Sequence, residues 1–389
     1  MPFLTAPKIH NGHQWLPQGS VIEVADDGTI IAIRPELPPG TIHYDGILTP
    51  GFVNVHCHLE LSHMKGVVPE HTGLIPFLKT IPTHRNDFTD EQKRIARHDG
   101  YNELLQNGVV AIGDIANTTD TLDVRANDQM HYYTFVESIG FTEANAARAF
   151  GYAQQTYNAF AAQHGNKMQL KQAIIPHAPY SVSSSLFRLI SEHKNNAAIS
   201  IHNQESEEEN KYYLSKEGNV RDLLHTLGID DSLFKPTGLS SLQSYLEWLS
   251  PTHPLVFVHN TYTKQEDIKY AHKRLKETYW CLCPNANLYI ENTLPDIDMF
   301  IREDARLCIG TDSLASNHHL SVLSELQSIK KHFPHISWET LLIWATNNGA
   351  HALQMQDVIG TIKTGKKPGI IQITGLDDES QPAVAKRIV

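Results

Sequence analysis

Eight short apolar segments, rich in valine and isoleucine and each followed by polar residues, are separated by amphipathic helical patterns. Parallel strands require long crossover connections, so this alternation is typical of an α/β protein with a parallel sheet. Eight repeats fit a (β/α)8 TIM-like barrel, which we predict as a catalytic domain over residues 49–357. The predicted strands are ILTPGFVNVHCH, GVVAIGDI, HYYTFVESIG, KQAIIPHAPY, AAISIHNQE, LVFVHN, YWCLCPNAN and RLCIGTDS.

Signals at the ends of the helical patterns support this division. Thr89 and Asp90 begin the segment TDEQKRIARHDGYNELLQNG as a helix start, and Asn107-Gly108 is a typical helix stop. We therefore predict a helix between the first and second strands.

The two ends of the chain have a different sequence pattern. Residues 1–48 contain short alternating strands, with Asp27-Gly28 as a hairpin turn inside SVIEVADDGTIIAI. Residues 358–389 return to short strands with Gly and Pro turns. We predict that these two segments pair into a small β-sandwich, an accessory domain beside the barrel.

Charge and composition limit the class of partner. The 389 residues carry a formal net charge of −11 and no basic run, which argues against nucleic acid or an anionic membrane and favours a small-molecule substrate. No apolar run approaches the roughly 18 residues of a membrane span. The four cysteines show no disulfide spacing, and Cys281-x-Cys283 is better explained as two buried hydrophobes than as half of a zinc site. We expect a cytoplasmic protein.

His56 and His58 flank one residue at the end of the first predicted strand. Alternate side chains of a strand point the same way, so these two imidazoles can bind one metal ion. The chain has 23 histidines, and roughly one or two such pairs would arise by chance, so the pair alone is a weak signal. Its place at a strand end, after Pro50-Gly51, makes a metal site the first hypothesis.

Titratable residues follow other predicted strands as well. Active sites of (β/α)8 barrels are built at the carboxyl ends of the strands, so residues at these ends are expected to share one site. The set comprises His56, His58, His177, His202, His259 and Asp312.

If the protein catalyses a metal-assisted hydrolysis, most of these residues have a role in it. A catalytic zinc typically takes three protein ligands and a water, whose pKa falls toward about 7. His56, His58 and His202 can supply the imidazoles, and Asp312 can touch the metal and orient the water. Glu205, three residues after His202, can move a proton from that water to the leaving group or to a ring nitrogen.

Two further histidines complete the candidate site. His259 can hydrogen-bond the attacking water or the developing oxyanion, and His177 is placed to contact substrate. Other side chains near the strand ends could read substrate polarity, although each could equally be structural: Glu60, His63, Glu137, Tyr180 and Asn287.

Seven ordered motifs carry a resemblance to a known family. PGFVNVHCHLE, HAPYSVS, SIHNQES, VHN, CPNANL, GTDSLASN and ATNNGAHAL occur in this order along the chain. With them, over essentially its whole length, the chain resembles the metal-dependent aminohydrolases and chlorohydrolases of the amidohydrolase superfamily. These include cytosine, guanine, S-adenosylhomocysteine and aminodeoxyfutalosine deaminases.

The resemblance implies the same roles for the same residues. Binuclear members carry a carboxylated lysine at the end of the fourth strand, where this chain has His177, and the nearest preceding lysine, Lys171, is at the start of that strand. A single divalent metal is implied, zinc or iron, and a homo-oligomer such as a dimer is expected. The implied ligands are His56, His58, His202 and Asp312, with Glu205 as general acid/base and His259 positioning the hydroxide.

The implied activity is hydrolytic deamination. Hydroxide held by the metal attacks a ring carbon that bears an amino group, Glu205 moves the proton, and ammonia leaves. HLELSHMKG and DSLASNHHLSVLSEL resemble a bacterial subgroup with relatives that act on aminodeoxyfutalosine, one candidate substrate. The ligands do not determine the leaving group, so chloride displacement and opening of a cyclic amide or imidazolone are alternatives. A non-catalytic scaffold is a third, against which the complete ligand set argues.

Overall fold

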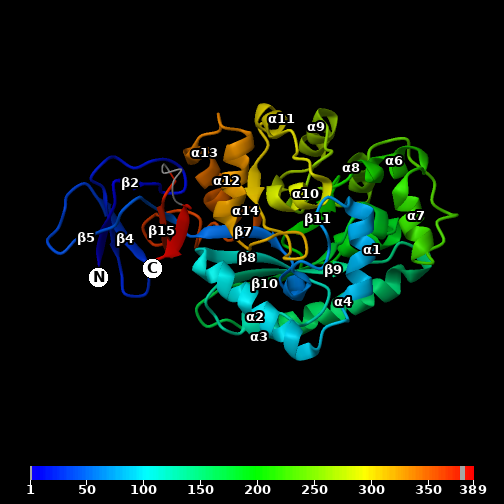
Figure 1. Cartoon of the computed structure of the whole chain (residues 1–389), viewed down its shortest axis with the longest axis horizontal. Coiled ribbons are helices and arrows are strands. Elements are labelled where there is room, and N and C mark those ends of the chain that lie inside the picture. Colours follow the sequence, from blue (N-terminus) through cyan, green and yellow to red (C-terminus); the bar gives the residue numbers. More distant parts are fainter. Residues whose placement is uncertain (1, 377–381) are drawn as a thin grey trace.

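The computed structural model describes residues 2–376 and 382–389. Its centre consists of eight strands in two parallel four-stranded sheets, with the orders β10-β9-β8-β7 and β11-β12-β13-β14. All eight predicted strands are present, and they alternate with helices in an α/β fold (Figure 1). The first begins only at Phe52, because Ile47–Pro50 form a separate strand, β6, in another sheet. The eight strands are β7 Phe52–Cys57, β8 Val109–Ala116, β9 His131–Ser138, β10 Leu170–Pro176, β11 Ile199–Asn203, β12 Leu255–His259, β13 Thr278–Leu282 and β14 Leu307–Ile309.

Hydrogen bonds join the two sheets at the carboxyl ends of their edge strands. The backbone N–H groups of Thr311 and Asp312, which follow β14, both donate to the carbonyl of His56 on β7 at 3.0 Å. At the other edge, the N–H of His202 on β11 donates to the carbonyl of His177, directly after β10, at 3.0 Å. The strand ends that carry the candidate residues are therefore held side by side.

The central strands are buried along their whole length, as expected where both faces of a parallel sheet are covered. The ring of Trp280 on β13 stacks on Phe257 of β12 with centroids 4.4 Å apart. Gly113 on β8 has no room for a side chain, because a Cβ there would lie 2.0 Å from the carbonyl oxygen of Val55. The pairing of β7 with β8 shifts register at this point, between Asn54 and Cys57.

Helices fill the connections between the strands. α2 begins at Asp90, with Thr89 as its N-cap in a capping box with Gln92, and ends at Gln106, which confirms the predicted limits. No helix among the described residues is long and apolar enough to cross a membrane. The others are α1 Leu74–His84, α3 Leu122–Arg125, α4 Ala146–Ala161, α5 Ser184–Ser191, α6 Glu207–Ser215, α7 Asn219–Thr226, α8 Ser241–Tyr245, α9 Gln265–Arg274, α10 Pro284–Glu291, α11 Ile297–Arg302, α12 Val322–His332, α13 Trp338–Ile343 and α14 Gly349–Ala352, with the short helix η1 Leu59–Met64.

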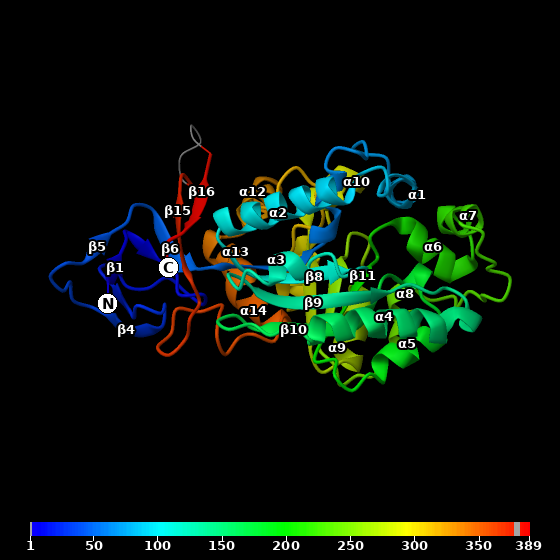
Figure 2. The same ribbon diagram turned by 90° about the horizontal axis from the view of Figure 1, so that it is seen from below.

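The strands near the two termini form two further sheets at one end of the molecule (Figures 1 and 2). Their orders are β4-β3-β1-β5 and β16-β15-β6-β2, so β15, near the C-terminus, pairs antiparallel with β6. The predicted turn at Asp27-Gly28 does connect two antiparallel strands, β3 and β4. These strands are β1 Phe3–Thr5, β2 Lys8–Ile9, β3 Val21–Val24, β4 Ile30–Arg34, β5 Ile42–His43, β6 Ile47–Pro50, β15 Ile370–Thr374 and β16 Val384–Arg387.

One apolar cluster contains residues from both terminal sheets. Leu4 of β1 and Ile22 of β3 belong to it, and so do Leu48 of β6 and Ile370 of β15. The two ends of the chain therefore share a core of their own beside the parallel sheets.

Candidate metal centre and active site

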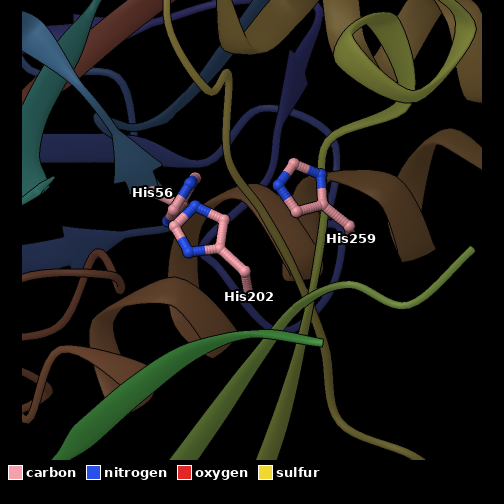
Figure 3. A group of neighbouring side chains, drawn as sticks. All are labelled: His56, His202 and His259. Carbon is pink, nitrogen blue, oxygen red and sulfur yellow. The ribbon is translucent and has the colours of Figure 1, made fainter. Parts of the chain in front are cut away.

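Side chains from several strand ends meet at the centre of the molecule. His56 lies on β7, His202 on β11 and His259 at the end of β12, and their rings form one group (Figure 3). His58 directly follows β7, and Asp312 lies three residues beyond β14. His56 and His58 reach the same group because alternate positions of an extended chain face the same side.

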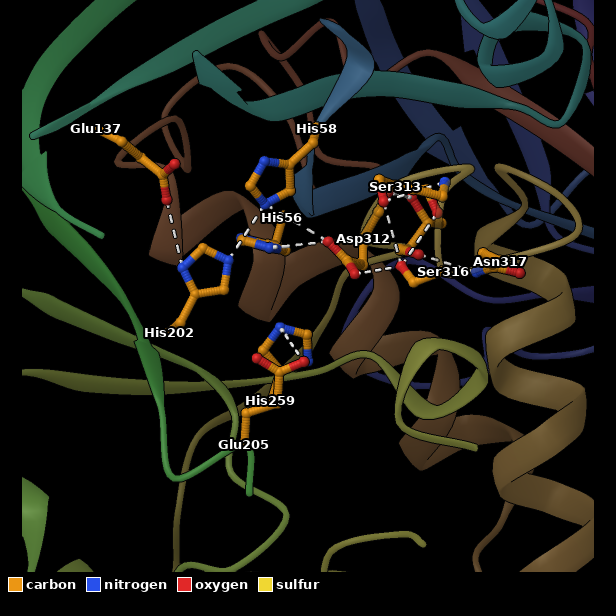
Figure 4. A network of polar contacts seen from close by, with 12 residues as sticks. His56, His58, Glu137, His202, Glu205, His259, Asp312, Ser313, Ser316 and Asn317 are labelled. Carbon is orange, nitrogen blue, oxygen red and sulfur yellow. Dashed lines mark hydrogen bonds and ion pairs between the residues drawn. The ribbon is translucent and has the colours of Figure 1, made fainter. Parts of the chain in front are cut away.

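Four of these side chains are spaced like ligands of one metal ion (Figure 4). Asp312 Oδ1 lies 3.4 Å from His56 Nε2 and 3.5 Å from His58 Nε2. His58 Nε2 lies 3.2 Å from His202 Nε2. In a tetrahedron with metal–ligand bonds of about 2.1 Å, neighbouring ligand atoms are about 3.4 Å apart. These three distances are of the size expected between neighbouring ligands of one metal ion such as zinc.

Burial and protonation of the histidines also fit a bound cation. Burial lowers the pKa of His58 to about 3 and holds that of His202 well below its ordinary value, so both rings are neutral. Two neutral ring nitrogens 3.2 Å apart repel each other when both direct lone pairs inward, and a cation between them removes the conflict. Apart from the Asp312 carboxylate 3.4 Å from its Nε2, neither nitrogen of His56 has a hydrogen-bond partner among the described residues. Overlapping groups with ligand atoms within 4.8 Å of one another are His56/His58/Asp312, His56/His202/His259 and His58/Glu137/His202.

Hydrogen bonds on the far side of His202 set the direction of its ring. Its Nδ1 lies 2.8 Å from the carbonyl oxygen of His177, which can only accept, so Nδ1 carries the proton and Nε2 presents a lone pair to the metal group. Glu137 Oε1 lies 3.3 Å from the same Nδ1. A carbonyl oxygen that accepts from a metal-binding histidine raises the basicity of the ring and holds its orientation.

Glu205 and His259 form a second pair beside the metal group. His259 Nε2 lies 3.7 Å from Glu205 Oε1, and His259 Nδ1 lies 2.9 Å from Asn287 Oδ1. Because the Asn287 amide oxygen accepts from Nδ1, Nε2 is left free toward Glu205. Burial, and the charges of Asp312 and Glu291, raise the pKa of Glu205 well above its ordinary range. Glu205 is thus a buried carboxyl suited to accept and donate a proton.

The backbone at these strand ends adopts an uncommon conformation. Gln204, His259, Asn260 and Asp312 have φ angles of 46°, 71°, 61° and 55°, in the left-handed region that residues other than glycine rarely adopt. Such strain persists only where the surroundings enforce it, and it gathers at functional sites. Here it turns the chain sharply after β11, β12 and β14, directly beside the grouped side chains.

A polar cluster holds the turn that precedes Glu205. Glu209 Oε1 accepts from the backbone N–H of Gln204 at 2.9 Å and also from the hydroxyl of Ser241. The Gln204 amide donates to Asp267 at 2.9 Å and to Asn210 at 3.1 Å. All of these groups are buried, so both the backbone and the side chain of Gln204 are held in place.

A cavity of about 260 Å³, here called the central cavity, is lined by these side chains. His58, His202, Glu205, His259 and Asp312 all line it. Much of the remaining wall is apolar and comes from α1 and α7. The other predicted contacts that line it are His177, Glu137 and Tyr180, and the apolar residues from the two helices are Leu74, Phe77, Leu78, Ile81, Pro82, Leu223 and Leu224.

Three predicted substrate contacts lie outside the lining that the described residues form around this cavity. Asn287 instead orients His259. Glu60 accepts hydrogen bonds from the backbone of Asn117 and Thr118, at 3.1 Å each. His63 lies 3.2 Å from the carbonyl oxygen of Arg85 and is not part of the central cavity. His63 lines a second pocket instead, which shares Arg85 with the central cavity, and a role for the three residues in substrate binding stays a prediction.

Several lining residues were absent from the sequence prediction. Arg85 follows α1, Asn117 follows β8, and Phe141 follows β9. Asn117 and Phe141 could have been found by extending the search a few residues past every strand end. Arg85 and the walls from α1 and α7 have no comparable sequence signal, because an apolar helix face that lines a cavity has the same periodicity as one that packs on a core.

Comparison with known proteins finds similar sequences and similar folds over most of the chain. The aminodeoxyfutalosine deaminase of a Nitratiruptor species is 26% identical over 353 residues, covering 89% of this chain and 83% of that protein. The crystal structure of Helicobacter pylori aminofutalosine deaminase in complex with methylthio-coformycin matches with a TM-score of 0.81 at 20% identity, covering 100% of both chains. Atrazine chlorohydrolase from Arthrobacter aurescens TC1 complexed with zinc matches with a TM-score of 0.75 at 15% identity, covering 95% of this chain and 86% of that one.

The family itself follows from the sequence match. The sequence model described as the amidohydrolase family matches residues 47–387, which include every candidate site residue. This confirms the resemblance drawn from the ordered motifs. The chain therefore belongs to the amidohydrolase family.

Proposed function

We propose that this protein is a metal-dependent hydrolase that removes an amino group from a nucleoside-like heterocycle. The observation that carries the proposal is the buried Glu205–His259 pair beside the four candidate ligands, on the wall of one cavity. The names of the relatives support the choice of ammonia as leaving group, since the first two are an aminodeoxyfutalosine deaminase and an adenosine deaminase.

One divalent metal, zinc or else iron, is proposed for the site. His56, His58, His202 and Asp312 would hold it, and when bound it would lower the pKa of a water and supply the nucleophile. A second ion of the carboxylated-lysine type has no support here. Lys171 lies at the start of β10 and its Nζ donates to the carbonyl of Gln354, while His177 occupies the other end of that strand.

The protein side chains would divide the remaining work. Glu205 would take a proton from the attacking water and pass it to a ring nitrogen of the substrate, so that ammonia can leave. His259, oriented through Nδ1 by Asn287, would hold the water with Nε2. Asp312, which accepts a hydrogen bond from the hydroxyl of Ser316, would help to fix the same water. Because these groups are fixed and buried, they would stabilise the charge that develops on the substrate during the reaction.

Ammonia release from a substrate panel tests the proposal directly. Purified zinc-loaded protein is assayed with aminodeoxyfutalosine, adenosine, 5′-methylthioadenosine, S-adenosylhomocysteine, guanine and cytosine. We expect a kcat/KM of about 10⁴ M⁻¹ s⁻¹ or more for at least one aminopurine nucleoside, with aminodeoxyfutalosine the first candidate. Absence of ammonia release from all six would contradict deamination of this substrate class.

Chloride displacement is a second candidate, favoured by the structural match to a zinc-containing atrazine chlorohydrolase. Opening of a cyclic amide or imidazolone uses the same groups. Chloride release from a chlorinated triazine, or ring opening of hydantoin-type compounds, without ammonia release would favour these reactions. Binding of less than one metal per purified chain would reopen the alternative of a non-catalytic scaffold.

We expect the polar cluster around Gln204 and Glu209 to hold Glu205 in position for catalysis. In Glu209→Ala, the buried N–H of Gln204 and the hydroxyl of Ser241 lose their acceptor, so the free energy of unfolding should fall by about 1–3 kcal/mol. Because Glu205 then loses its fixed position, kcat should fall about 10- to 100-fold. Urea unfolding and steady-state kinetics measure the two effects. Glu207→Ala, at an exposed position of the same segment, is the matched control. An unchanged kcat in Glu209→Ala would show that the cluster is not needed for positioning.

We also propose that the two parallel sheets close into the predicted (β/α)8 barrel and that the terminal sheets form a β-sandwich. The hydrogen bonds at both sheet edges and the shared apolar cluster support these two assignments. The division into residues 49–357 and the two terminal segments stays a prediction. The homo-oligomer stays a prediction. Sedimentation of the purified chain as a monomer would contradict it.

A further inference from the structure

Two of the ordered motifs, CPNANL and GTDSLASN, contain polar residues that the proposed mechanism does not use. The first motif carries Asn287, which orients a histidine of the site, and the second carries Asp312, a candidate metal ligand. One further asparagine from each motif, Asn285 and Asn317, donates to the side chain of Glu325. Glu325 lies on α12 and is fully buried, so a single carboxyl group connects the two motifs.

One oxygen of Glu325 holds the loop that carries Asp312. The side-chain amide of Asn317 donates to Glu325 Oε1 at 2.8 Å and to the carbonyl oxygen of Thr311 at 2.9 Å. Ser316, the neighbour of Asn317 in the chain, donates from its hydroxyl to Asp312 Oδ2 (Figure 4). Asp312 has a φ of 55°, and such a turn persists only where surrounding contacts enforce it. Through Asn317, Glu325 supplies one of these contacts.

The other oxygen of Glu325 holds the start of α10. The backbone N–H of Asn285 donates to Glu325 Oε2 at 2.8 Å. Asn285 is the second residue of this helix, where N–H groups have no partner inside the helix, and a negative charge is also favoured at this end by the helix dipole. Two residues later on α10, the amide oxygen of Asn287 accepts from His259 Nδ1 at 2.9 Å. The second oxygen therefore holds the helix that orients His259.

Both contacts require a carboxyl group at position 325. Asn285 and Asn317 each present an N–H donor, so a side-chain amide in place of Glu325 would offer one acceptor for two donors. No ion pair involves Glu325 within residues 2–376 and 382–389. Burial of a carboxylate without a cation costs free energy, which favours a role in the reaction over a role in stability alone.

We propose that Glu325 is a positioning residue that keeps Asp312 and His259 at a fixed separation. One of its oxygens acts through Asn317 and the other through Asn285. This rests on the proposed deamination, in which Asp312 and His259 hold the same water. A displacement of about 1 Å in such a group can lower a rate about 100-fold, so the link between the two segments bears directly on turnover.

Glu325→Gln tests the link, because it keeps the size of the side chain and removes one of the two acceptors. In zinc-loaded protein, kcat for the best substrate of the panel should fall about 10- to 100-fold. KM should change less than about threefold, because the lining that the described residues form around the central cavity does not include Glu325. In cobalt-substituted protein, the visible absorption bands of the metal should shift or change in intensity, because Asp312 no longer keeps its native position.

Asp128→Asn is the matched control. Asp128 is a half-buried carboxylate just before β9, at the opposite ends of the strands from the metal group, and it accepts from the backbone N–H groups of residues 166–168. The control also loses an acceptor for backbone donors, so its free energy of unfolding should fall. Its kcat and its cobalt bands should remain those of the native protein. Urea unfolding of both variants allows kcat to be compared at similar losses of stability.

Asn317→Ala breaks only the contact toward Asp312. It should change the cobalt bands as well, so it tests the proposal even if Glu325→Gln does not fold. Where both variants fold, the double variant should lose less kcat than the product of the two single losses, because the two residues act through one contact. A loss equal to that product would show that they act independently and would overturn the proposed link.

The cobalt bands separate this proposal from the proposed function. If the native protein releases no ammonia from any compound of the panel, deamination is wrong. A band change in Glu325→Gln that is absent from Asp128→Asn would then still support the positioning of Asp312. Unchanged bands in Glu325→Gln, or a kcat within about threefold of the native value, would overturn the role of Glu325. An equal loss of kcat in Asp128→Asn would overturn it too, since the effect would then follow stability alone.

Discussion

Glu205→Gln should lower kcat for deamination by about 10²- to 10⁴-fold while leaving metal content unchanged. The substitution keeps the size of the side chain and removes the oxygen that exchanges a proton. Glu205 is buried, its pKa is raised well above the ordinary range, and its carboxyl lies 3.7 Å from His259 Nε2. An amide there can still accept a hydrogen bond, but it cannot transfer the proton that the departing ammonia requires. Single-turnover ammonia release by zinc-loaded protein measures the effect.

The matched control is Glu207→Gln, two residues further along the chain. Glu207 is exposed at the start of α6 and pairs with Lys211 at 3.0 Å. A surface pair of this kind contributes little, so the control should keep kcat within about twofold. A Glu205→Gln protein that retains more than a tenth of native turnover would show that another group moves the proton.

His202→Ala should reduce bound metal from about one ion per chain to a small fraction and abolish turnover. His202 Nε2 lies 3.2 Å from His58 Nε2, and its Nδ1 is held by the carbonyl of His177, so the ring is fixed with one nitrogen toward the other candidate ligands. Loss of one protein ligand lowers the affinity for the metal and disturbs the geometry of the site. Elemental analysis after dialysis measures the stoichiometry. Treatment of native protein with a chelator should also lower Tm, because a ligand that binds only the folded state stabilises it.

His335→Ala is the control for metal binding. His335 is an exposed histidine that pairs with Asp298 at 2.7 Å, remote from the four ligands in sequence and on the surface. The His335→Ala protein should bind as much metal per chain as the native protein. Two tightly bound ions per native chain would contradict the single-metal proposal, and native turnover in a fully chelated protein would contradict metal dependence.

The central strands were predictable because their signal is local. Runs such as GVVAIGDI combine high β-propensity with burial on both faces, so they appear as continuous apolar segments of strand length. The limits of α2 were equally local, since Thr89 caps the helix through its own side chain. Whether the sheets form a closed barrel depends on how their edges meet, which no single segment encodes.

The metal group was predictable for a topological reason. Parallel strands place their carboxyl ends at one edge, so polar residues that follow several strands are brought together whatever the detailed geometry. The same rule placed Glu205 and His259 in the site. It gave no means to separate a residue on the cavity wall, such as Tyr180, from one that orients a neighbour, such as Asn287. That difference depends on side-chain direction, which is set by contacts with distant segments.

By itself, the sequence determined the alternation of strands and helices, the order of the ligand-bearing motifs and hence the family. Only the tertiary structure decided the 3.2–3.5 Å spacing of the ligand atoms, the left-handed turn at Gln204 and the place of Arg85 between two cavities. The physical reason is the distance along the sequence over which each kind of interaction acts. Strand and helix propensities act within a few residues, whereas Arg85 is held by Glu60, which in turn is held by Asn117, and such chains of contact exist only after the segments have packed together.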